Sequence, residues 1–396
     1  MSKTHISTPH KIDNPHKIDN QRHLFDMPDD IAYLNCAYMG PLMKPAVQAA
    51  ETGIQYKVRP WTYGGSSFFT DTEQLRELAA KLINTGSDNI ALVPSASYGI
   101  QVAANNIPLS KGGEILVLKD QFPSHIYPWR EKAKACGGKV VTAERPQNGD
   151  WTTSVLQAVS PRTEILALPA THWADGGYLD LETIGKTARD IGAKLVLDLT
   201  QSLGAMPFDV KTVRPDYMVA AGYKWLLGPY TMAYLYVAPQ WHAGAPLEHN
   251  WMNRKGSEDF ARLVDYQDEF QPGARRFDMG EKSNPAQVMA ASAALTQLLD
   301  WGVANIAATL GARNSRVADH ARQLGFLVVD DKFRSPHYVG LEFKDGVPDG
   351  LAEKLAADNI FVSVRGNSVR VTPHLYNTDT DIERLFDALE HATSRS

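Results

Sequence analysis

The chain has 396 residues, of which 43% are hydrophobic and 21% charged, and its formal net charge is −5. This composition is ordinary for a globular protein with a large core. The chain has no excess of positive charge, which a nucleic-acid-binding protein would be expected to carry. No apolar run reaches transmembrane length, and the polar N-terminus lacks the apolar core of a signal peptide. Two cysteines, Cys36 and Cys136, are too few for a disulfide framework, so we expect a cytoplasmic protein that binds neither nucleic acid nor membranes.

The first 24 residues form a polar stretch for which we predict a flexible tail. Residues 9–14 read PHKIDN, and residues 15–20 repeat the same six letters. Two copies of six residues are too short to build a repeat fold, so the repetition does not change this prediction. The histidines do not have the spacing of a compact zinc site, and we expect no metal.

Residues 25–88 are expected to form a segment that packs near the C-terminal domain. Within it, Thr70-Asp71-Thr72-Glu73 has the pattern of a capping box, in which two side chains satisfy the first free amides of a helix. The pattern predicts a helix that begins there and turns Leu75, Leu78 and Leu82 inward.

Residues 89–299 are predicted to form a large α/β domain. Short apolar runs alternate there with amphipathic segments, and continuous apolar runs are typical of strands buried on both faces of a sheet. One helix is expected at residues 180–191, with Gly192 as its stop. The alternation favours a mostly parallel sheet covered by helices. The expected strands are 90–93, 115–118, 140–142, 165–168, 195–197, 217–220 and 232–237.

Residues 300–396 differ in pattern and are predicted to form a smaller α+β domain. A helix-rich stretch comes first, and a final helix is expected at residues 380–392 because its apolar residues recur at helical spacing. Short apolar runs between these helices indicate a few strands. The expected strands are 326–329, 338–343, 360–364 and 369–371.

A single lysine, Lys224, lies in the apolar and glycine-flanked decapeptide 220–229, shortly after an expected strand. An acidic residue, Asp198, ends another expected strand 26 positions earlier. A lysine in a dry pocket has a lowered pKa and forms a Schiff base with an aldehyde. An acidic group can keep the pyridine nitrogen of pyridoxal phosphate (PLP) protonated, so that the ring draws electrons from the substrate. Together the two residues predict a PLP enzyme.

Further candidate residues follow other expected strands, where ligands bind in open parallel sheets. Ala96 and Ser97 stand at the start of an expected helix, where free amides and a hydroxyl suit a phosphate. Phe122 can lie flat on a cofactor ring, and Thr171 can hydrogen-bond a bound substrate. Gln201 comes three positions after the acidic residue, where its amide can meet the phenolic oxygen of the ring.

Two arginines near the C-terminus, Arg365 and Arg370, are candidates for substrate binding. An arginine makes a bidentate, charge-assisted pair with a carboxylate, and an amino-acid substrate supplies that carboxylate. The four residues between the two arginines include no cysteine.

These motifs in this order resemble the class V aminotransferase family of fold-type I PLP enzymes. The resemblance rests on Asp198-x-x-Gln201, on Gly222-Tyr223-Lys224 and on residues 370–377. It covers the chain from about residue 25 to residue 390. It implies a large PLP-binding domain, a small C-terminal domain, and a homodimer with active sites at its interface.

The resemblance also implies a role for individual residues. Lys224 would be the Schiff-base lysine and the base that moves the α-proton, and Asp198 would be the partner of the pyridinium nitrogen. Gln201 would meet the ring oxygen, and Phe122 would stack on the ring. The phosphate would be bound by Ala96, Ser97 and Tyr223, the substrate by Arg370 and Asn35, and the phosphate of a neighbouring subunit by Ser283 and Asn284.

The absence of a cysteine beside Arg370 disfavours a desulfurase that forms a persulfide, because such enzymes carry a catalytic cysteine there. We expect a PLP-dependent enzyme that acts on an α-amino acid, and we favour an aminotransferase because transamination needs no further catalytic group. A β-eliminating C–S lyase or a kynureninase-like hydrolase is the alternative. An epimerase and a non-enzymatic PLP-fold binding protein follow after these.

Overall fold

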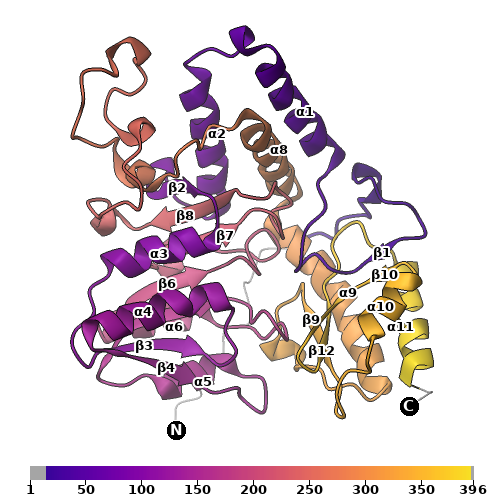
Figure 1. Cartoon of the computed structure of the whole chain (residues 1–396). Helices are drawn as coiled ribbons and strands as arrows, with labels where there is room; N and C mark the ends of the chain where they lie inside the picture. Colours follow the sequence, from indigo (N-terminus) through magenta and orange to yellow (C-terminus); the bar gives the residue numbers. More distant parts are fainter. Residues whose placement is uncertain (1–14, 394–396) are drawn as a thin grey trace.

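The structure, a computed structural model, describes residues 15–393. At its centre lies a seven-stranded sheet (Figure 1). One strand, Ala233–Val237, runs antiparallel to both of its neighbours, and the other neighbouring pairs are parallel. The predicted α/β fold with a mostly parallel sheet is therefore confirmed. Across the sheet the strands are β2 (Ile90–Val93), β8 (Ala233–Val237), β7 (Tyr217–Ala221), β6 (Lys194–Asp198), β5 (Thr163–Pro169), β3 (Glu114–Leu118) and β4 (Lys139–Ala143).

Helices cover both faces of this sheet. α3 (Ala96–Asn106) and α4 (Tyr127–Cys136) pack on one face and share one apolar core with it. α5 (Trp151–Ala158), α6 (Leu181–Asp190) and the short α7 (Val210–Val213) join the core on the other face. Central strands such as β3 and β7 are buried along their whole length, which accounts for their continuous apolar sequence. β4, at the edge, is only partly buried.

The helix expected at residues 180–191 is α6. The side chain of Asp180 accepts hydrogen bonds from the amides of Glu182 and Thr183, both at 3.1 Å, and so caps its first turn. Gly192 follows the helix with φ of +74°, a backbone conformation that glycine adopts without strain.

The capping box predicted at Thr70 is wrong. α2 (Ser67–Leu82) begins three residues earlier, and the hydroxyl of Thr72 donates to the carbonyls of Phe68 and Phe69 inside the helix. Both phenylalanines contact other aromatic rings, among them Trp251 at 6.3 Å from the ring of Phe69. This aromatic packing extends the helix by a turn that the local sequence pattern does not indicate.

The C-terminal part of the chain packs around its own apolar core and a three-stranded antiparallel sheet. The strand expected at residues 326–329 is wrong, because only Leu327 pairs, in an isolated bridge with Glu342. Leu327 is 48% exposed, so burial does not favour a longer pairing. The elements are α9 (Val303–Gln323), β9 (Val339–Glu342), α10 (Leu351–Ala357), β10 (Ile360–Phe361), β11 (Ser363–Arg365), β12 (Ser368–Val371) and α11 (Asp379–Thr393).

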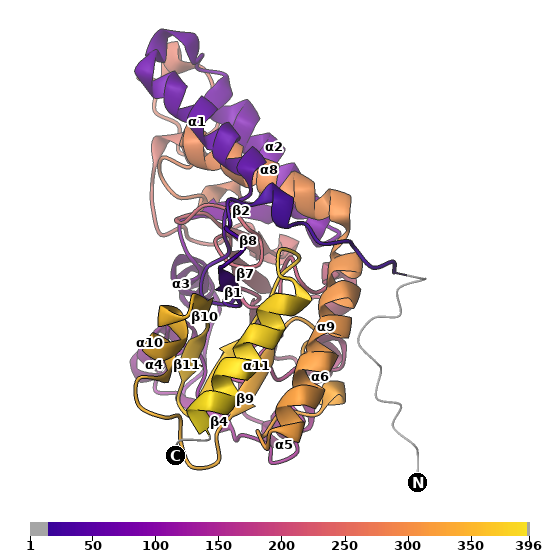
Figure 2. The same ribbon diagram turned by 90° about the vertical axis from the view of Figure 1, so that its right-hand side faces the viewer.

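Residues before β2 divide between the two parts of the molecule. β1 (Ala32–Tyr33) pairs in parallel with β10 of the C-terminal part. α1 (Lys44–Val58) and α2 instead pack on α8 (Pro285–Trp301), which the two views show above the large sheet (Figures 1 and 2). The predicted domain boundaries at residues 25, 89 and 300 stay a prediction.

The second copy of the repeated hexapeptide is held against α9. The amide of His16 donates to the side chain of Asn305 at 3.1 Å, and the amide of Ile18 donates to Thr309 at 2.9 Å. Ile18 also packs on the large apolar core. The sequence did not predict these contacts, and the first copy lies outside the described residues. Among the helices of residues 15–393, none combines the length and apolarity that a membrane span requires.

Candidate active site

A cavity of about 230 Å³ lies where β3, β5, β6 and β7 end. Because the carboxyl ends of parallel strands meet at one edge of a sheet, side chains that follow different strands converge there. This convergence brings together eight of the residues singled out in the sequence. The cavity is lined by Ala96, Ser97, Phe122, Thr171, Asp198, Gln201, Tyr223 and Lys224 from that set, together with others that include Ser95, Gln121, Ser124, His125, His172, Trp173, Thr200 and Tyr230.

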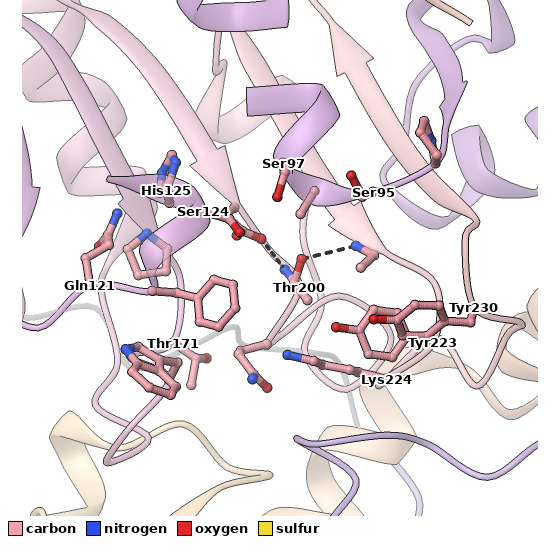
Figure 3. Close-up of a pocket in the computed structure, with 18 of the residues that line it drawn as sticks. Ser95, Ser97, Gln121, Ser124, His125, Thr171, Thr200, Tyr223, Lys224 and Tyr230 are labelled. Atoms are coloured by element: carbon pink, nitrogen blue, oxygen red, sulfur yellow. Dashed lines mark hydrogen bonds between the residues drawn. The ribbon is translucent and has the colours of Figure 1, made fainter. Parts of the chain in front are cut away.

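Lys224 lies in the turn that follows β7, and its side chain extends away from Tyr223 into the middle of the cavity (Figure 3). Gly40 packs against this turn so closely that a Cβ there would lie 2.2 Å from the carbonyl oxygen of Lys224. The amine is 5.6 Å from the ring centroids of both Phe122 and Tyr223. It makes no hydrogen bond or ion pair with the residues that the structure describes.

The environment of Lys224 favours the neutral amine. Burial lowers its pKa to about 8, and the positive charges of Arg370 and Arg365 act in the same direction, whereas Asp198 opposes them. An amine with this pKa is partly unprotonated near neutral pH, so it can act as a nucleophile or accept a proton.

Asp198 is the last residue of β6 and is 8% exposed. Its Oδ1 accepts a hydrogen bond from the amide of Thr200 at 2.9 Å, and the hydroxyl of Thr200 in turn accepts one from the amide of Ala221 at 3.1 Å (Figure 3). These bonds fix the carboxylate between the ends of β6 and β7. The second carboxylate oxygen makes no hydrogen bond to the described part of the chain.

His125 ends the 3₁₀ turn that precedes α4, and it lies close enough to Asp198 to be affected by its charge. Burial lowers its pKa to about 4, although the charge of Asp198 acts to raise it. Its Nδ1 accepts a hydrogen bond from Trp129 at 3.4 Å, and within residues 15–393 its Nε2 has no partner. The imidazole is therefore neutral. His125 was not among the residues predicted from the sequence, although it stands three positions after Phe122.

Gln201 lines the cavity, but its side chain is already hydrogen-bonded. Nε2 donates to the carbonyl of Ala37 at 3.1 Å, and Oε1 accepts from the indole of Trp225 at 3.0 Å. One amide hydrogen is left to meet a ligand, which the sequence motif could not show because both partners come from distant parts of the fold.

The start of α3 borders the cavity beside two tyrosines. The hydroxyl of Ser95 caps the helix by accepting from the amide of Tyr98 at 3.1 Å. The amides of Ala96 and Ser97 are the first of the helix and so have no acceptor within it, which makes this end a place for an anion. The ring of Tyr223 lies 4.4 Å from that of Tyr230, and burial raises the pKa of Tyr223 to about 12, so its hydroxyl stays protonated.

Phe122 and Thr171 also line the cavity. Phe122 is 38% exposed and meets Trp173 edge to face at 5.5 Å, so one face of its ring is open to a ligand. Thr171 is buried, and its hydroxyl shares a 2.7 Å hydrogen bond with Ser335. A bound substrate would therefore compete with Ser335 for that hydroxyl.

Arg370 reaches this region from β12. It is buried, its Nη1 donates to the carbonyl of Trp173 at 3.2 Å, and its Nε has no hydrogen-bond partner in the described chain. Arg365 on β11 lies near the same indole and is half-buried. Neither arginine lines the cavity itself, and both lie next to the ring of Trp173, which does. Neither guanidinium forms an ion pair with a described carboxylate, so the positive charge beside this lining residue is uncompensated.

Besides the two arginines, three more predicted residues do not line the cavity. The side chain of Asn35 accepts a hydrogen bond from the hydroxyl of Ser363 at 2.7 Å and is absent from the lining. Ser283 is buried against the sulfur of Met252, and Asn284 caps α8. Their roles toward substrate and toward a neighbouring subunit stay predictions.

The groups around the cavity fit PLP. Lys224 offers an unpartnered amine, Asp198 a fixed carboxylate with one free oxygen, and Phe122 an open aromatic face. The start of α3 offers an anion site, and Arg370 offers a cation without a carboxylate. A doubly covered α/β sheet with this set of groups at its carboxyl edge defines a fold-type I PLP-dependent enzyme.

Comparison with known proteins confirms this class and gives the family. Residues 58–385 match the family model described as aminotransferase class-V, so the chain belongs to that family. An uncharacterized aminotransferase of Bacillus subtilis, YcbU, is 26% identical and covers 88% of this chain and 90% of its own length. A probable cysteine desulfurase of Methanothermobacter thermautotrophicus is 29% identical over 52% of this chain and 53% of its own.

The fold also has a counterpart among solved structures. A cysteine desulfurase of Thermococcus onnurineus, solved in its apo form, superposes with a TM-score of 0.84. The two chains are 18% identical, and the match covers 96% of this chain and all of the other. The predicted family, fold, cofactor and enzyme class are thus confirmed.

Proposed function

We propose that this chain catalyses transamination of an α-amino acid, with Lys224 as its acid–base group. Among the titratable residues that line the cavity, Lys224 combines an unpartnered basic atom with a pKa lowered to about 8. His125 is buried with a pKa near 4, and His172 is held between Asp175 and the carbonyl of Lys119. Transamination requires one group that removes and returns protons, and this cavity offers one.

The remaining residues position the reactants in this proposal. PLP, when bound, withdraws electrons from the carbon that carries the substrate amine. Asp198 would supply a negative charge to the ring nitrogen, and the start of α3 with Ser97 and Tyr223 would bind the phosphate. Arg370 binds the α-carboxylate, which orients the α-hydrogen toward Nζ of Lys224. Lys224 then takes that proton and returns it to a different carbon.

A test of this proposal separates amino transfer from elimination. The purified protein with PLP is mixed with a panel of amino acids, with and without a keto acid. We expect product only when the keto acid is present, and amino-group transfer to that acid. Release of ammonia and pyruvate without any keto acid would contradict transamination and identify a lyase.

A β-eliminating lyase is the second candidate, and the desulfurase relative favours it. A persulfide mechanism is not available to the described residues, because no thiol lines the cavity. Cys36 is fully buried with its sulfur 3.8 Å from the carbonyl oxygen of Lys224, and burial raises the pKa of its thiol well above its usual value. Cys136 lies at the end of α4. A lyase reaction here would therefore proceed by direct elimination.

We also propose that the active protein is a cytoplasmic homodimer. Trp61, Val264 and Tyr266 are 81%, 78% and 94% exposed, and large apolar side chains of this exposure are common at protein interfaces. Tyr230 is 59% exposed at the rim of the cavity, so a second subunit can complete that rim. Light scattering coupled to size-exclusion chromatography measures the oligomer, and a monomer at working concentration would contradict the proposal.

A further inference from the structure

The hairpin of β11 and β12 presents two arginines on one face. Ser363 pairs with Arg370 and Arg365 pairs with Ser368 across the two strands. Directly paired residues and residues two apart on one strand share a face of a sheet, so Arg365 and Arg370 are diagonal neighbours. Their guanidinium carbons lie 5.9 Å and 6.0 Å from the ring centroid of the same side chain, Trp173.

This face is held close to the cavity. Trp173 lines the cavity, its indole nitrogen donates to the carbonyl of Asp120 at 2.6 Å, and its own carbonyl accepts from Arg370 and from the hydroxyl of Tyr338. On the next strand, Gly340 pairs with Arg370, and a Cβ there would lie 2.9 Å from the Cα of Asp175. The absence of a side chain at Gly340 therefore lets the hairpin approach the large sheet.

Among residues 15–393, the two other buried arginines have carboxylate partners. Arg76 forms a bidentate pair with Asp278 at 2.8 and 2.9 Å, and Arg334 pairs with Asp331 at 2.8 Å. Arg365 donates to the neighbouring carbonyl of Val364, and it forms no ion pair with a described residue. Two adjacent guanidiniums without counter-charges are unfavourable, and each adds to the field that lowers the pKa of Lys224. A site of this kind is complete when two negative groups enter it.

We propose that Arg365 binds a second acidic group, located in the side chain of the substrate, so that the preferred substrates are acidic α-amino acids and their keto acids. This inference rests on the proposed function, in which Arg370 takes the α-carboxylate. One carboxylate is common to every α-amino acid and satisfies one arginine. The second arginine distinguishes substrates that carry another carboxylate from those that do not.

Two other arrangements would leave Arg365 without a specificity role. Its guanidinium is half-buried, so water alone can solvate it, or an acidic residue of a second subunit can pair with it. In both cases the affinity for a ligand would not depend on a second carboxylate. The number of carboxylates on the ligand is therefore the variable that tests the proposal.

The test measures binding to the PLP-loaded protein by calorimetry. Succinate and butyrate have the same number of carbons and differ by one carboxylate, and neither carries an amine that reacts. We expect wild type to bind succinate at least about tenfold more tightly than butyrate, since a charge-assisted pair contributes this much. In Arg365→Gln the affinity for succinate falls to that for butyrate, while the affinity for butyrate is unchanged.

Matched variants make the result specific. Arg365→Lys keeps the charge and recovers part of the preference for succinate, whereas Arg130→Gln removes an exposed arginine on α4 and changes neither affinity. Equal affinities in wild type, or an equal loss for both ligands in Arg365→Gln, would overturn the proposal. Retention of the preference in Arg365→Gln would also overturn it.

A further variant separates this inference from the proposed function. Arg370→Gln is expected to weaken both ligands, while the absorbance of bound PLP stays unchanged. If Arg370→Gln weakens neither ligand, the assigned α-carboxylate site is wrong. If Arg370→Gln weakens the binding of both ligands and Arg365→Gln weakens the binding of neither, the α-carboxylate site at Arg370 is supported and the proposed side-chain site at Arg365 is wrong.

Discussion

The loops of the large sheet that line the cavity and the β11–β12 hairpin beside it differ in how their polar side chains are paired. In the loops of the large sheet, Asp198 is bonded to Thr200, and Gln201 is bonded to Ala37 and Trp225. The hairpin of the C-terminal part instead leaves Arg370 without a carboxylate. A cofactor that stays bound can be held by a preformed frame, in which hydrogen bonds fix Asp198 and Gln201 while Lys224 and one oxygen of Asp198 stay open to the ligand. A substrate that enters and leaves in each cycle supplies the missing charge itself, so its region is incomplete in the free protein.

The largest effect on activity is expected from replacing Lys224, the reactive residue in the loops of the large sheet. We expect Lys224→Ala to lower turnover by roughly 10²–10⁴-fold, because the proton-transfer group is removed. The absorbance that wild type shows with PLP is expected to be lost or shifted, and both quantities are measured on the same samples. Lys134→Ala, which changes an exposed lysine of α4, serves as the control and retains both. Turnover within tenfold of wild type in Lys224→Ala would contradict the assignment.

The second effect compares a paired and an unpaired buried arginine. Arg76→Met removes the bidentate partner of the buried Asp278, which then keeps Lys282 as its one remaining ion-pair partner among the described residues, and we expect a loss of about 3 kcal/mol in unfolding free energy. Arg370→Met removes a charge that has no carboxylate partner, so the apoprotein is expected to lose less than about 1 kcal/mol or to gain stability. Denaturant unfolding of both apoprotein variants measures this difference. Similar losses would show that Arg370 is compensated in the free protein and would end the contrast between the two regions.

The same contrast explains how far the sequence could predict this molecule. The strands and the residues that follow them are local signals, since a buried strand has a continuous apolar sequence and Lys224 and Asp198 each follow one. The residues that converge on the cavity could therefore be predicted without coordinates, and their roles toward the cofactor stay predictions. Three-dimensional contacts decide the rest: Asn35 is turned toward Ser363, and Thr171 toward Ser335. Neither partner is near in the sequence, so no local pattern shows that these side chains are engaged.

Errors in the predicted elements have the same origin. The start of α2 is fixed by aromatic contacts of Phe68 and Phe69 with distant rings, among them Phe260. At residues 326–329 an apolar sequence lacks a partner strand along its length, and a single bridge forms. In each case the local sequence favours a helix or strand, but its length depends on whether other parts of the fold pack or pair with it.

The third effect is the pH dependence of stability that the buried amine introduces. Burial lowers the pKa of Lys224 from 10.5 to about 8. The unfolded chain therefore binds more protons than the folded chain between these values, and the stability of the apoprotein rises with pH through this window. Below pH 8 the charged amine costs about 3 kcal/mol, which Lys224→Met removes.

Unfolding free energies at pH 7, 9 and 10.5 test this dependence. We expect the advantage of Lys224→Met over wild type to be largest at pH 7, smaller at pH 9 and absent near pH 10.5. Lys134→Met is the control, and its difference from wild type is expected to be constant. An advantage that grows with pH would show that the lysine is stabilised as a cation, which would reverse its role in the first region.

The smallest effect distinguishes two serines at the start of α3, one satisfied and one free. The hydroxyl of Ser95 already accepts from the amide of Tyr98, so Ser95→Ala is expected to cost about 1 kcal/mol of stability and to leave the affinity for PLP unchanged. Ser97 lines the cavity, and its hydroxyl forms no hydrogen bond within the described chain. Ser97→Ala is expected to leave stability unchanged and to weaken PLP binding by roughly fivefold, as measured by titration of the apoprotein. If both variants weaken PLP binding equally, the capping hydroxyl of Ser95 also takes part in binding the phosphate. The distinction between hydroxyls that are already bonded and hydroxyls that are open to a ligand would then not hold at the start of α3.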